Sequence, residues 1–156
     1  MIRPLSREDR GPIRDLVAAT GVFTEEEVVI AVELIDAALD VPGQTDYIIR
    51  VAEEGGKVAG YYCVGPTPAT EGTFDLYWVA VDPALHGKGI GRALDDDACN
   101  LVREMSGRLI IAETSSLPRY RRTRDFYMRR GYSQLATIVD YYRPGDDLVV
   151  YGKYLT

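Results

Sequence analysis

Apolar residues near the start of the chain recur at every third or fourth position, which is the spacing of an amphipathic helix. The residues that follow this spacing are Val28, Ala31, Val32, Ile35, Ala38 and Leu39. Thr24 and Glu27 precede this run at the spacing of a capping box, and Pro42 and Gly43 follow it. The pattern therefore predicts a helix that begins after Thr24 and ends before Pro42.

Strand patterns dominate from residue 47 onward. Residues 47–53 and 57–64 flank Glu54-Gly55-Gly56, a turn signal that predicts a β-hairpin. A short strand is expected at residues 1–5, and the remaining strands are expected over residues 73–81, 108–114, 132–142 and 148–155. The strand at 108–114 is continuously apolar, which is typical of a strand that is covered on both faces.

Helical patterns separate these strands. Ser6 and Asp9 form a weaker capping pattern after the first strand, and a final helix is expected over residues 119–130 with Gly131 just past its end. A glycine-led helix is expected to run to about residue 106, with four inward side chains, Leu94, Ala98, Leu101 and Met105. The order β-α-α-β-β-β-α-β-α-β-β predicts an α/β or α+β fold with a single mixed sheet.

Length and charge narrow the possibilities. The 156 residues are expected to form a single domain, residues 1–156. A formal net charge of −6 argues against general affinity for nucleic acid or for an anionic membrane. There is no transmembrane-length apolar run and no signal-peptide core, and two cysteines with one histidine argue against disulfides and zinc. We therefore expect a cytoplasmic protein that contains no metal.

The most informative segment leads from one strand directly into a helix. His86-Gly87-Lys88-Gly89-Ile90-Gly91 places three alternating glycines where that helix begins. Glycine leaves the main chain uncovered, and the first N–H groups of a helix have no internal partner. The helix dipole adds about half a positive charge at this end, so a phosphate group is bound favourably there. The turn is therefore predicted to hold a phosphorylated cofactor.

Two common phosphate-binding loops do not match this turn. A Walker loop requires Ser or Thr after Gly-Lys, whereas Gly89 follows Lys88. A dinucleotide fingerprint requires Gly-x-Gly-x-x-Gly in a βαβ unit. The turn resembles instead the pyrophosphate loop of the GNAT superfamily of acetyl-CoA-dependent N-acetyltransferases, written Gln/Arg-x-x-Gly-x-Gly/Ala. Both glycines of that pattern match, while His86 stands where the family has Gln or Arg.

The resemblance covers essentially the whole chain and implies a particular fold and cofactor. The implied fold is a mixed, mostly antiparallel seven-stranded sheet with helices on both faces, and the implied co-substrate is acetyl-CoA. Main-chain amides from Lys88 through Ala93 would bind the diphosphate, and Val79 to Val81 would pair with the pantetheine amides. The side chains of Lys88 and Arg92 either add charge near the phosphates or are solvated. The implied cofactor-binding residues are Val79, Ala80, Val81, His86, Gly87, Lys88, Gly89, Ile90, Gly91, Arg92 and Ala93.

Acetyl transfer from a thioester to an amine requires two proton movements. An amine with a pKa of about 10.4 must lose a proton, and a thiolate whose thiol has a pKa of about 8.5 must gain one. Residues 123–132 match the family's later motif, which implies that Tyr127 donates the proton to sulfur. The alternative is that Tyr127 is only a core aromatic. The base stays open between Asp75, Glu33 and a chain of water molecules, and Glu113 is expected to be structural.

Two other groups of residues have alternative interpretations. The six arginines within residues 119–130 either form a solvated helix face or contact the ribose phosphate of the cofactor through Arg119, Arg121 or Arg122. The first two helices and the last turn would recognise the acceptor, unless that turn is an ordinary hairpin. The acceptor candidates are Phe23, Glu26, Tyr141, Tyr142, Asp146 and Asp147.

These observations lead to one expected function and two alternatives. The expected function is transfer of an acetyl group from acetyl-CoA to a primary amine of a small molecule, an amino acid or a peptide, directly in a ternary complex. The alternatives are a non-catalytic acyl-CoA-binding or regulatory domain and a protein-modifying acyltransferase. The expected partner is a small-molecule amine, with no nucleic acid and no membrane. A homodimer is allowed by analogy with GNAT relatives.

Overall fold

The computed structural model describes residues 1–155, and it has the element order that the sequence predicts. The strands are β1 (Ile2–Pro4), β2 (Ile48–Glu54), β3 (Lys57–Pro66), β4 (Thr73–Val81), β5 (Leu109–Ser115), β6 (Ser133–Arg143) and β7 (Asp146–Tyr154). The α-helices are α1 (Arg10–Ala19), α2 (Glu25–Asp40), α3 (Ile90–Glu104) and α4 (Arg121–Arg129). Short 3₁₀ turns, η1 (Arg7–Asp9), η2 (Pro83–Leu85) and η3 (Pro118–Tyr120), precede α1, α3 and α4.

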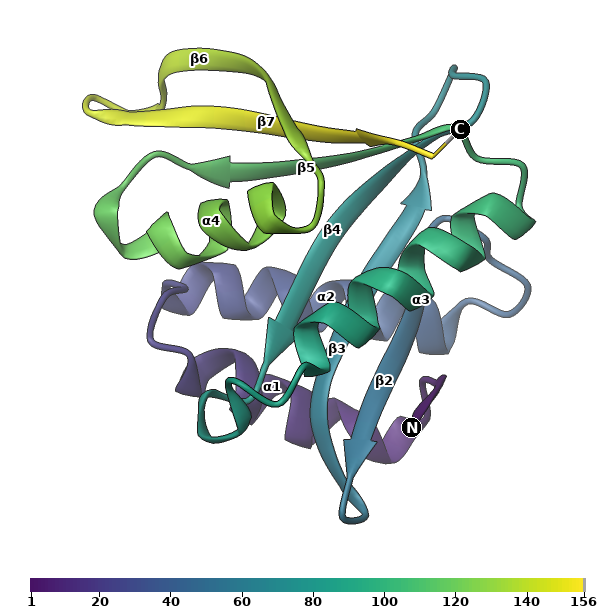
Figure 1. Cartoon of the computed structure of the whole chain (residues 1–156). Helices are drawn as coiled ribbons and strands as arrows, with labels where there is room; N and C mark the ends of the chain where they lie inside the picture. Colours follow the sequence, from purple (N-terminus) through teal and green to yellow (C-terminus); the bar gives the residue numbers. More distant parts are fainter. Residues whose placement is uncertain (156) are drawn as a thin grey trace. The chain divides into compact units, whose positions relative to one another are not determined.

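The described strands form one seven-stranded sheet in the order β1-β2-β3-β4-β5-β7-β6 (Figure 1). The pairs β1–β2, β2–β3, β5–β7 and β6–β7 are antiparallel, and β4–β5 is parallel. This confirms the expected fold, a mixed and mostly antiparallel sheet of the GNAT type. The turn between β2 and β3 consists of Gly55 and Gly56 at φ values of 60° and 78°, a conformation that suits glycine.

The chain divides into two compact units. The first unit contains Met1–Gly65 and Tyr77–Asn100, and the second contains Pro66–Leu76 and the chain from Leu101 onward. Strand β4 and helix α3 therefore each contribute residues to both units. The two units are described separately below.

In the first unit, alternate residues of β3 face different helices. Tyr61 and Cys63 belong to the core cluster that includes Ile13 and Val17 of α1 and Ile35 of α2. Tyr62, which points to the opposite face of the strand, donates a hydrogen bond from its hydroxyl to Asp97 of α3 at 2.7 Å. Helices therefore cover both faces of the strands in this unit, as expected for the fold (Figure 1).

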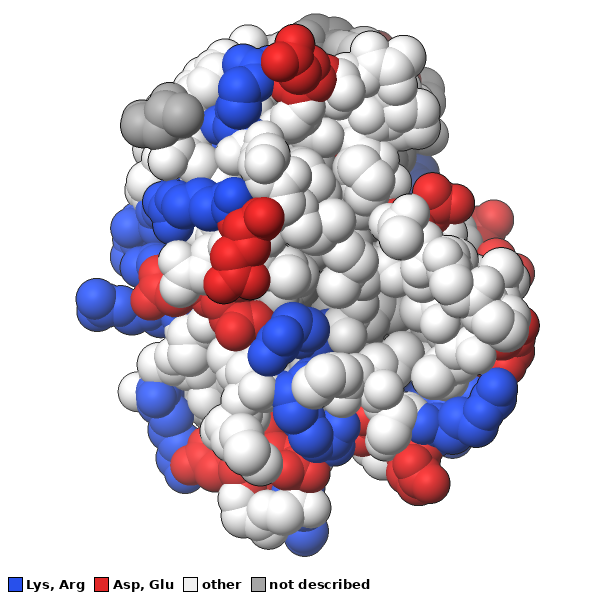
Figure 2. Space-filling model, turned by 90° about the vertical axis from the view of Figure 1, so that its right-hand side faces the viewer, with Lys and Arg blue, Asp and Glu red and all other residues white. Residues whose placement is uncertain are grey.

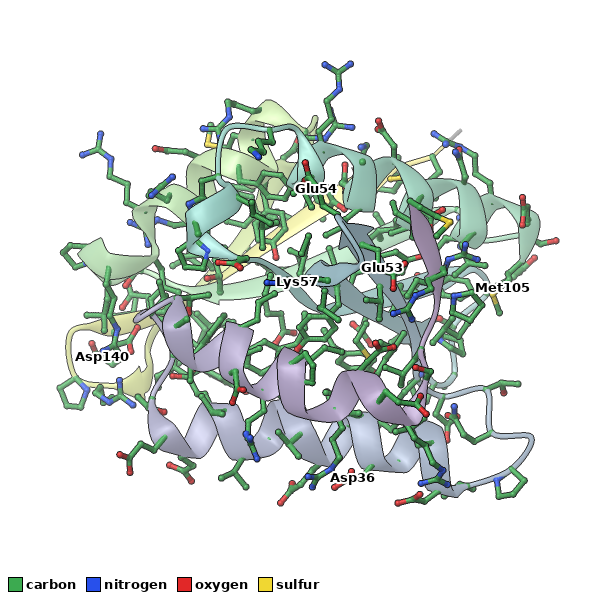
Figure 3. All side chains as sticks on the ribbon, turned by 90° about the horizontal axis from the view of Figure 1, so that it is seen from below. Asp36, Glu53, Glu54, Lys57, Met105 and Asp140 are labelled. Carbon is green, nitrogen blue, oxygen red and sulfur yellow. The ribbon has the colours of Figure 1, made fainter. Side chains whose placement is uncertain are left out.

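The helix predicted after Thr24 has the predicted cap. The Thr24 hydroxyl accepts from the Glu27 amide at 3.2 Å, and the Glu27 carboxylate accepts from the Thr24 amide at 3.1 Å. Arg10 of α1 donates to Asp36 of α2 at 2.6 and 3.0 Å, and Figure 3 shows Asp36 on the outer side of α2. This hydrogen bond to Arg10 lowers the pKa of the Asp36 carboxyl.

The N-terminal strand is fastened by a buried carboxylate. Arg3 donates two hydrogen bonds to Asp9, each at 2.8 Å, and a third to Glu53 at 3.0 Å. Asp9 also accepts from the Ser6 amide at 2.8 Å, which is the capping contact that the sequence predicts. These contacts join β1, η1 and β2, and the hydrogen bond from Arg3 is the main cause that lowers the pKa of Asp9.

In the second unit, tyrosines pack between α4 and the last strands. The ring centroid of Tyr127 lies 5.2 Å from that of Tyr132 and 5.7 Å from that of Tyr151. A Cβ atom at Gly152 of β7 would meet the end of the Leu135 side chain, so Leu135 would have to shift to admit a larger residue at this position. Gly131 ends α4 at a φ of 88°, as its position in the sequence predicts.

One part of the sequence prediction for α3 is wrong. Leu94 and Ala98 are fully buried as expected, but Met105 is 39% exposed. The reason is that α3 ends at Glu104, so Met105 lies past the regular helix, where Figure 3 shows it at the edge of the structure. No helix within residues 1–155 is both long and apolar enough to cross a membrane.

Candidate active site

The glycine turn has the conformation that the phosphate-binding prediction requires. Gly87 and Gly89 have φ values of 83° and 79°, which residues with a side chain rarely adopt. An added Cβ atom at either position would meet no atom within 4 Å. The surface of this turn is therefore bare main chain that a ligand can approach closely.

The turn leads into a helix end that carries unsatisfied amides. The first hydrogen bond of this helix runs from the Ala93 amide to the Gly89 carbonyl at 3.0 Å. The amides from Gly89 to Arg92 therefore have no partner within the helix. Such a row of N–H groups at the positive end of the helix dipole fits a diphosphate, so the residues present suit the coenzyme A portion of acetyl-CoA.

The charged side chains of the turn lie in solvent. Lys88 forms an ion pair with Glu54 at 3.8 Å, and Arg92 approaches Asp96 at 4.0 Å. His86 is exposed, and Ile90 is half-buried. On the molecular face drawn in Figure 2, acidic and basic side chains lie interspersed. The main chain of the turn is thus the stronger candidate for holding a diphosphate. For the side chains of Lys88 and Arg92 both predictions stay open: they either add positive charge near the phosphates or are solvated.

The strand that precedes the turn has its predicted position. Val79, Ala80 and Val81 form the end of β4, where Ala80 is buried in the core and its two neighbours are half-buried. The parallel ladder with β5 covers Thr73, Phe74 and Asp75 of this strand. Val79 to Val81 lie beyond that ladder, so the ladder with β5 does not use their main-chain groups. This agrees with the role that the resemblance implies for them and does not test it.

Tyr127 lies in the second unit, on α4. Its side chain is 5% exposed and is packed against Phe126, Tyr132 and Tyr151. The Tyr132 amide donates to the Tyr127 carbonyl at 3.0 Å, which fixes the turn that follows the helix. The ring is therefore rigidly positioned, as both the catalytic and the core interpretation of Tyr127 require.

Asp75, one of the two carboxylates predicted as the base, lies beside Glu113. Asp75 is half-buried, and it accepts a hydrogen bond from the Thr67 hydroxyl at 2.8 Å. Partial burial raises the pKa of the Glu113 carboxyl, and the negative charge of Asp75 raises it further. The two carboxylates therefore interact, and Glu113 gains a feature that is common among proton acceptors. The sequence alone assigned Glu113 a structural role.

Other predicted residues are distributed over both units. Glu33, the second candidate base, is exposed on α2 of the first unit. Phe23 packs edge-on against Trp78 with 4.7 Å between ring centroids, and Glu26 is exposed. Asp146 is only 2% exposed, so this residue cannot line an open acceptor site.

The turn between β6 and β7 is a hydrogen-bonded arch. Asp146 accepts from the Ser115 hydroxyl and from Arg143, the latter at 2.8 Å. Asp147 accepts from the Asp140 amide at 2.9 Å. Asp140 in turn accepts from the Gly145 amide at 2.8 Å. The arch presents Tyr141 and Tyr142, whose rings meet edge-on with centroids 5.0 Å apart.

The arginine-rich segment also has mixed roles. Arg124 donates to the carbonyls of Ser115 and Leu117 at 2.8 and 2.9 Å, so it holds the connection between β5 and α4. Arg121 lies 3.9 Å from Asp125 on the exposed side of α4, and Arg119 lies over the ring of Tyr120. Arg124 therefore has a structural role that neither interpretation of the segment includes, and the contact of Arg119, Arg121 or Arg122 to a ribose phosphate stays a prediction.

The structure explains one polar residue on α3 that has no role in the sequence analysis. Asp97 accepts from the Tyr62 hydroxyl and lies 3.0 Å from Arg50 Nε, so it completes a polar cluster between β2, β3 and α3. Burial and this hydrogen bond raise the pKa of Tyr62. Only a long-range pairing could have identified Asp97, because Arg50 and Tyr62 are distant in sequence.

The comparisons with known proteins agree with this geometry. Residues 45–134 match a family profile that is described as "Acetyltransferase (GNAT) domain". A crystal structure of a candidate GNAT acetyltransferase from Desulfovibrio desulfuricans is 43% identical, with a TM-score of 0.94 over 100% of this chain and 99% of that chain. The chain belongs to the GNAT acetyltransferase family. None of the proteins with curated functions matches the sequence.

More distant GNAT structures share the fold. An aminoglycoside 6′-N-acetyltransferase complexed with coenzyme A is 15% identical, with a TM-score of 0.76 over 100% of this chain and 97% of that chain. The ribosomal-protein-S18-alanine N-acetyltransferase from Escherichia coli is 17% identical, with a TM-score of 0.78 over 100% of this chain and 94% of that chain. These two enzymes are named for different acceptors, yet their sequence identities and TM-scores to the present chain are similar. Similarity at this level therefore shows the shared fold and does not identify an acceptor.

We predict that Glu113→Gln stabilises the protein at neutral pH. The pKa of Glu113 is raised in the folded state, so the folded state loses stability as the pH rises through that pKa. The variant should melt about 1–2 °C above the parent at pH 7.5, and the difference should vanish at a pH below the ordinary pKa of glutamate.

The matched control is Glu71→Gln, which removes an exposed carboxylate from the loop before β4. Thermal melting followed by circular dichroism over a pH series measures both variants. An equal shift in the two variants would show that the effect is only the loss of one negative charge.

Proposed function

We propose that this protein transfers an acetyl group from acetyl-CoA to a primary amine of a small molecule, an amino acid or a peptide, directly in a ternary complex. The observation that carries the proposal is the bare glycine turn at the start of α3. Membership of the GNAT acetyltransferase family supports the transferase class. A coenzyme A complex of a neighbour with the same fold supports the cofactor.

Binding would depend mainly on main-chain groups. The amides from Gly89 to Arg92 would donate hydrogen bonds to the diphosphate, at the positive end of α3. The main chain of Val79 to Val81 would pair with the pantetheine amides like an added strand. His86 would replace the Gln or Arg of the family pattern without altering this main-chain cradle.

The chemical step requires a neutral amine and a proton for sulfur. The amine nitrogen would attack the thioester carbonyl carbon, and the C–S bond would break with its electron pair going to sulfur. The Tyr127 hydroxyl would give its proton to the departing thiolate. Since a thiolate is a tolerable leaving group, alignment of the reactants would contribute more than the acid.

The proton acceptor for the amine is best supported at Asp75 and Glu113. The neighbouring Asp75 is one cause of the raised pKa of Glu113, and Asp75 is held by the Thr67 hydroxyl. A carboxylate with a raised pKa accepts the proton of an ammonium group with less penalty. Asp75, Glu113 and Tyr127 all belong to the second unit. Glu33 on α2 stays the alternative base.

We predict that acetyl-CoA stabilises the parent protein and not Gly89→Val. At about a hundred times its dissociation constant, the ligand should raise the melting temperature by about 5 °C or more, because it binds only the folded state. A branched side chain at residue 89 would occupy the open space over the amides.

Gly43→Val is the matched control for this prediction. Gly43 also has a positive φ, 75°, and open space around an added Cβ atom, but it lies after α2 and away from the turn. This variant should carry the same backbone strain and keep the shift with acetyl-CoA. Loss of the shift in both variants, or in neither, would contradict the assignment of the turn.

We predict that Tyr127→Phe lowers kcat by about tenfold to a hundredfold and leaves acetyl-CoA binding unchanged. Thiol release would be measured with acetyl-CoA and a panel of polyamines, amino acids, aminoglycosides and peptides. The parent should release thiol with at least one amine, and the best acceptor is then used for the variants. Phenylalanine keeps the ring packing, so a core role alone would leave kcat unchanged.

The control for the hydroxyl is Tyr154→Phe, because Tyr154 is 64% exposed at the end of β7. It should keep the parent's kcat. A panel in which no amine releases thiol, together with an intact acetyl-CoA shift, would support the non-catalytic acyl-CoA-binding domain. Release with peptides alone would support the protein-modifying acyltransferase.

A further inference from the structure

The Lys88 side chain of the glycine turn has a charged partner on another element. Its ammonium nitrogen lies 3.8 Å from Oε1 of Glu54, the last residue of β2. Both residues belong to the first unit, and within residues 1–155 neither side chain forms a second ion pair. The cofactor turn is therefore linked by charge to the hairpin of β2 and β3, at which Figure 3 labels Glu54.

The hairpin holds the main chain of Glu54 in place. Glu54 pairs with Lys57 in the ladder between β2 and β3, and Gly55 and Gly56 close the turn. A two-residue turn of this kind fixes the register of its strands. Lys88, in contrast, stands between two glycines and carries its charge on a flexible four-carbon stem. Lys88 is therefore the partner that can move while Glu54 stays.

The ion pair is weak enough to exchange its partner. The side chains of Lys88 and Glu54 are 55% and 46% exposed, and their separation of 3.8 Å is longer than a hydrogen bond. Water and salt screen such a pair, so it contributes little to stability. A diphosphate carries a negative charge on each phosphate and attracts an ammonium group more strongly than a single carboxylate does.

The second basic side chain of the turn has a different kind of partner. Arg92 approaches Asp96, which lies one turn later on the same helix. Pairs at this spacing are common on helix surfaces and link the turn to no other element. Lys88 directly precedes Gly89, the first residue whose amide has no partner within the helix. Of the two cations, Lys88 is thus the one that a second element controls.

We infer that Glu54 is a positioning residue that holds Lys88 and thereby lowers the affinity for acetyl-CoA. When acetyl-CoA binds, Lys88 exchanges the carboxylate for the diphosphate, and no covalent bond changes. Because the ion pair must first be broken, its free energy is subtracted from that of cofactor binding. The inference rests on the cofactor part of the proposed function and not on the acetyl transfer.

A double-mutant cycle tests this inference. The dissociation constant of acetyl-CoA is measured by isothermal titration calorimetry for the parent, Glu54→Gln, Lys88→Gln and the double variant. Glu54→Gln should tighten binding by about threefold, and Lys88→Gln should weaken it by about threefold. In the Lys88→Gln background, Glu54→Gln should have almost no effect, because Glu54 acts through Lys88. Equal tightening in both backgrounds, or no tightening at all, would overturn the inference.

Two controls separate the ion pair from other effects. Glu71→Gln removes an exposed carboxylate of the second unit, makes the same change in net charge and should leave the parent's affinity unchanged. The advantage of Glu54→Gln should also disappear between about 20 and about 500 mM salt, because salt screens exposed charges. An advantage that persists at high salt would come from a change in the shape of the site and would contradict the inference.

A measurement on the parent covers variants that fold poorly. The ¹³C signal of the Glu54 carboxylate should shift when acetyl-CoA saturates the protein, since Lys88 then leaves it. An unmoved signal would overturn the inference. A thiol-release panel in which every amine fails would count against the transfer reaction and leave these affinities measurable. A parent that binds no acetyl-CoA would overturn both the inference and the proposed function.

Discussion

The start of α3 sets the main constraint on this protein. A helix leaves its first N–H groups without internal partners, and here those groups follow a turn that only glycine adopts comfortably at Gly87 and Gly89. The absence of side chains exposes the amides, and the helix dipole gives them a partial positive charge. The chain on both sides of the turn is well packed, since Ala80 at the end of β4 and Leu94 on α3 are both buried.

Much of the fold follows from local patterns in the sequence. Thr24 and Glu27 identify the start of α2, and Gly55 and Gly56 identify the β2–β3 turn, because these features depend on near neighbours alone. The α3 boundary was less accurate, since Met105 keeps the apolar period after the helix has ended. The polar residues required the folded chain: Asp97 pairs with Arg50, and Asp146 accepts a hydrogen bond from the Ser115 hydroxyl, each across a long sequence separation.

The candidate site shows the same division between local and long-range information. The glycine turn is a local motif, so its residues could be named from the sequence. The base could not, because a carboxylate becomes a proton acceptor through its neighbours. The raised pKa of Glu113 depends on burial and on Asp75, which lies on another strand. Position on a strand could suggest Asp75, but it gave no reason to distinguish Glu113 from a structural residue.

The central claim is that the amides at the start of α3 bind the diphosphate of coenzyme A. Titration of ¹⁵N-labelled protein, observed by NMR, tests it most directly when acetyl-CoA is compared with S-acetylpantetheine, which lacks the diphosphate. We expect the amide signals of Gly89, Gly91 and Arg92 to shift strongly with acetyl-CoA and little with S-acetylpantetheine. Signals that stay unmoved at saturating acetyl-CoA, or that respond equally to both compounds, would contradict it.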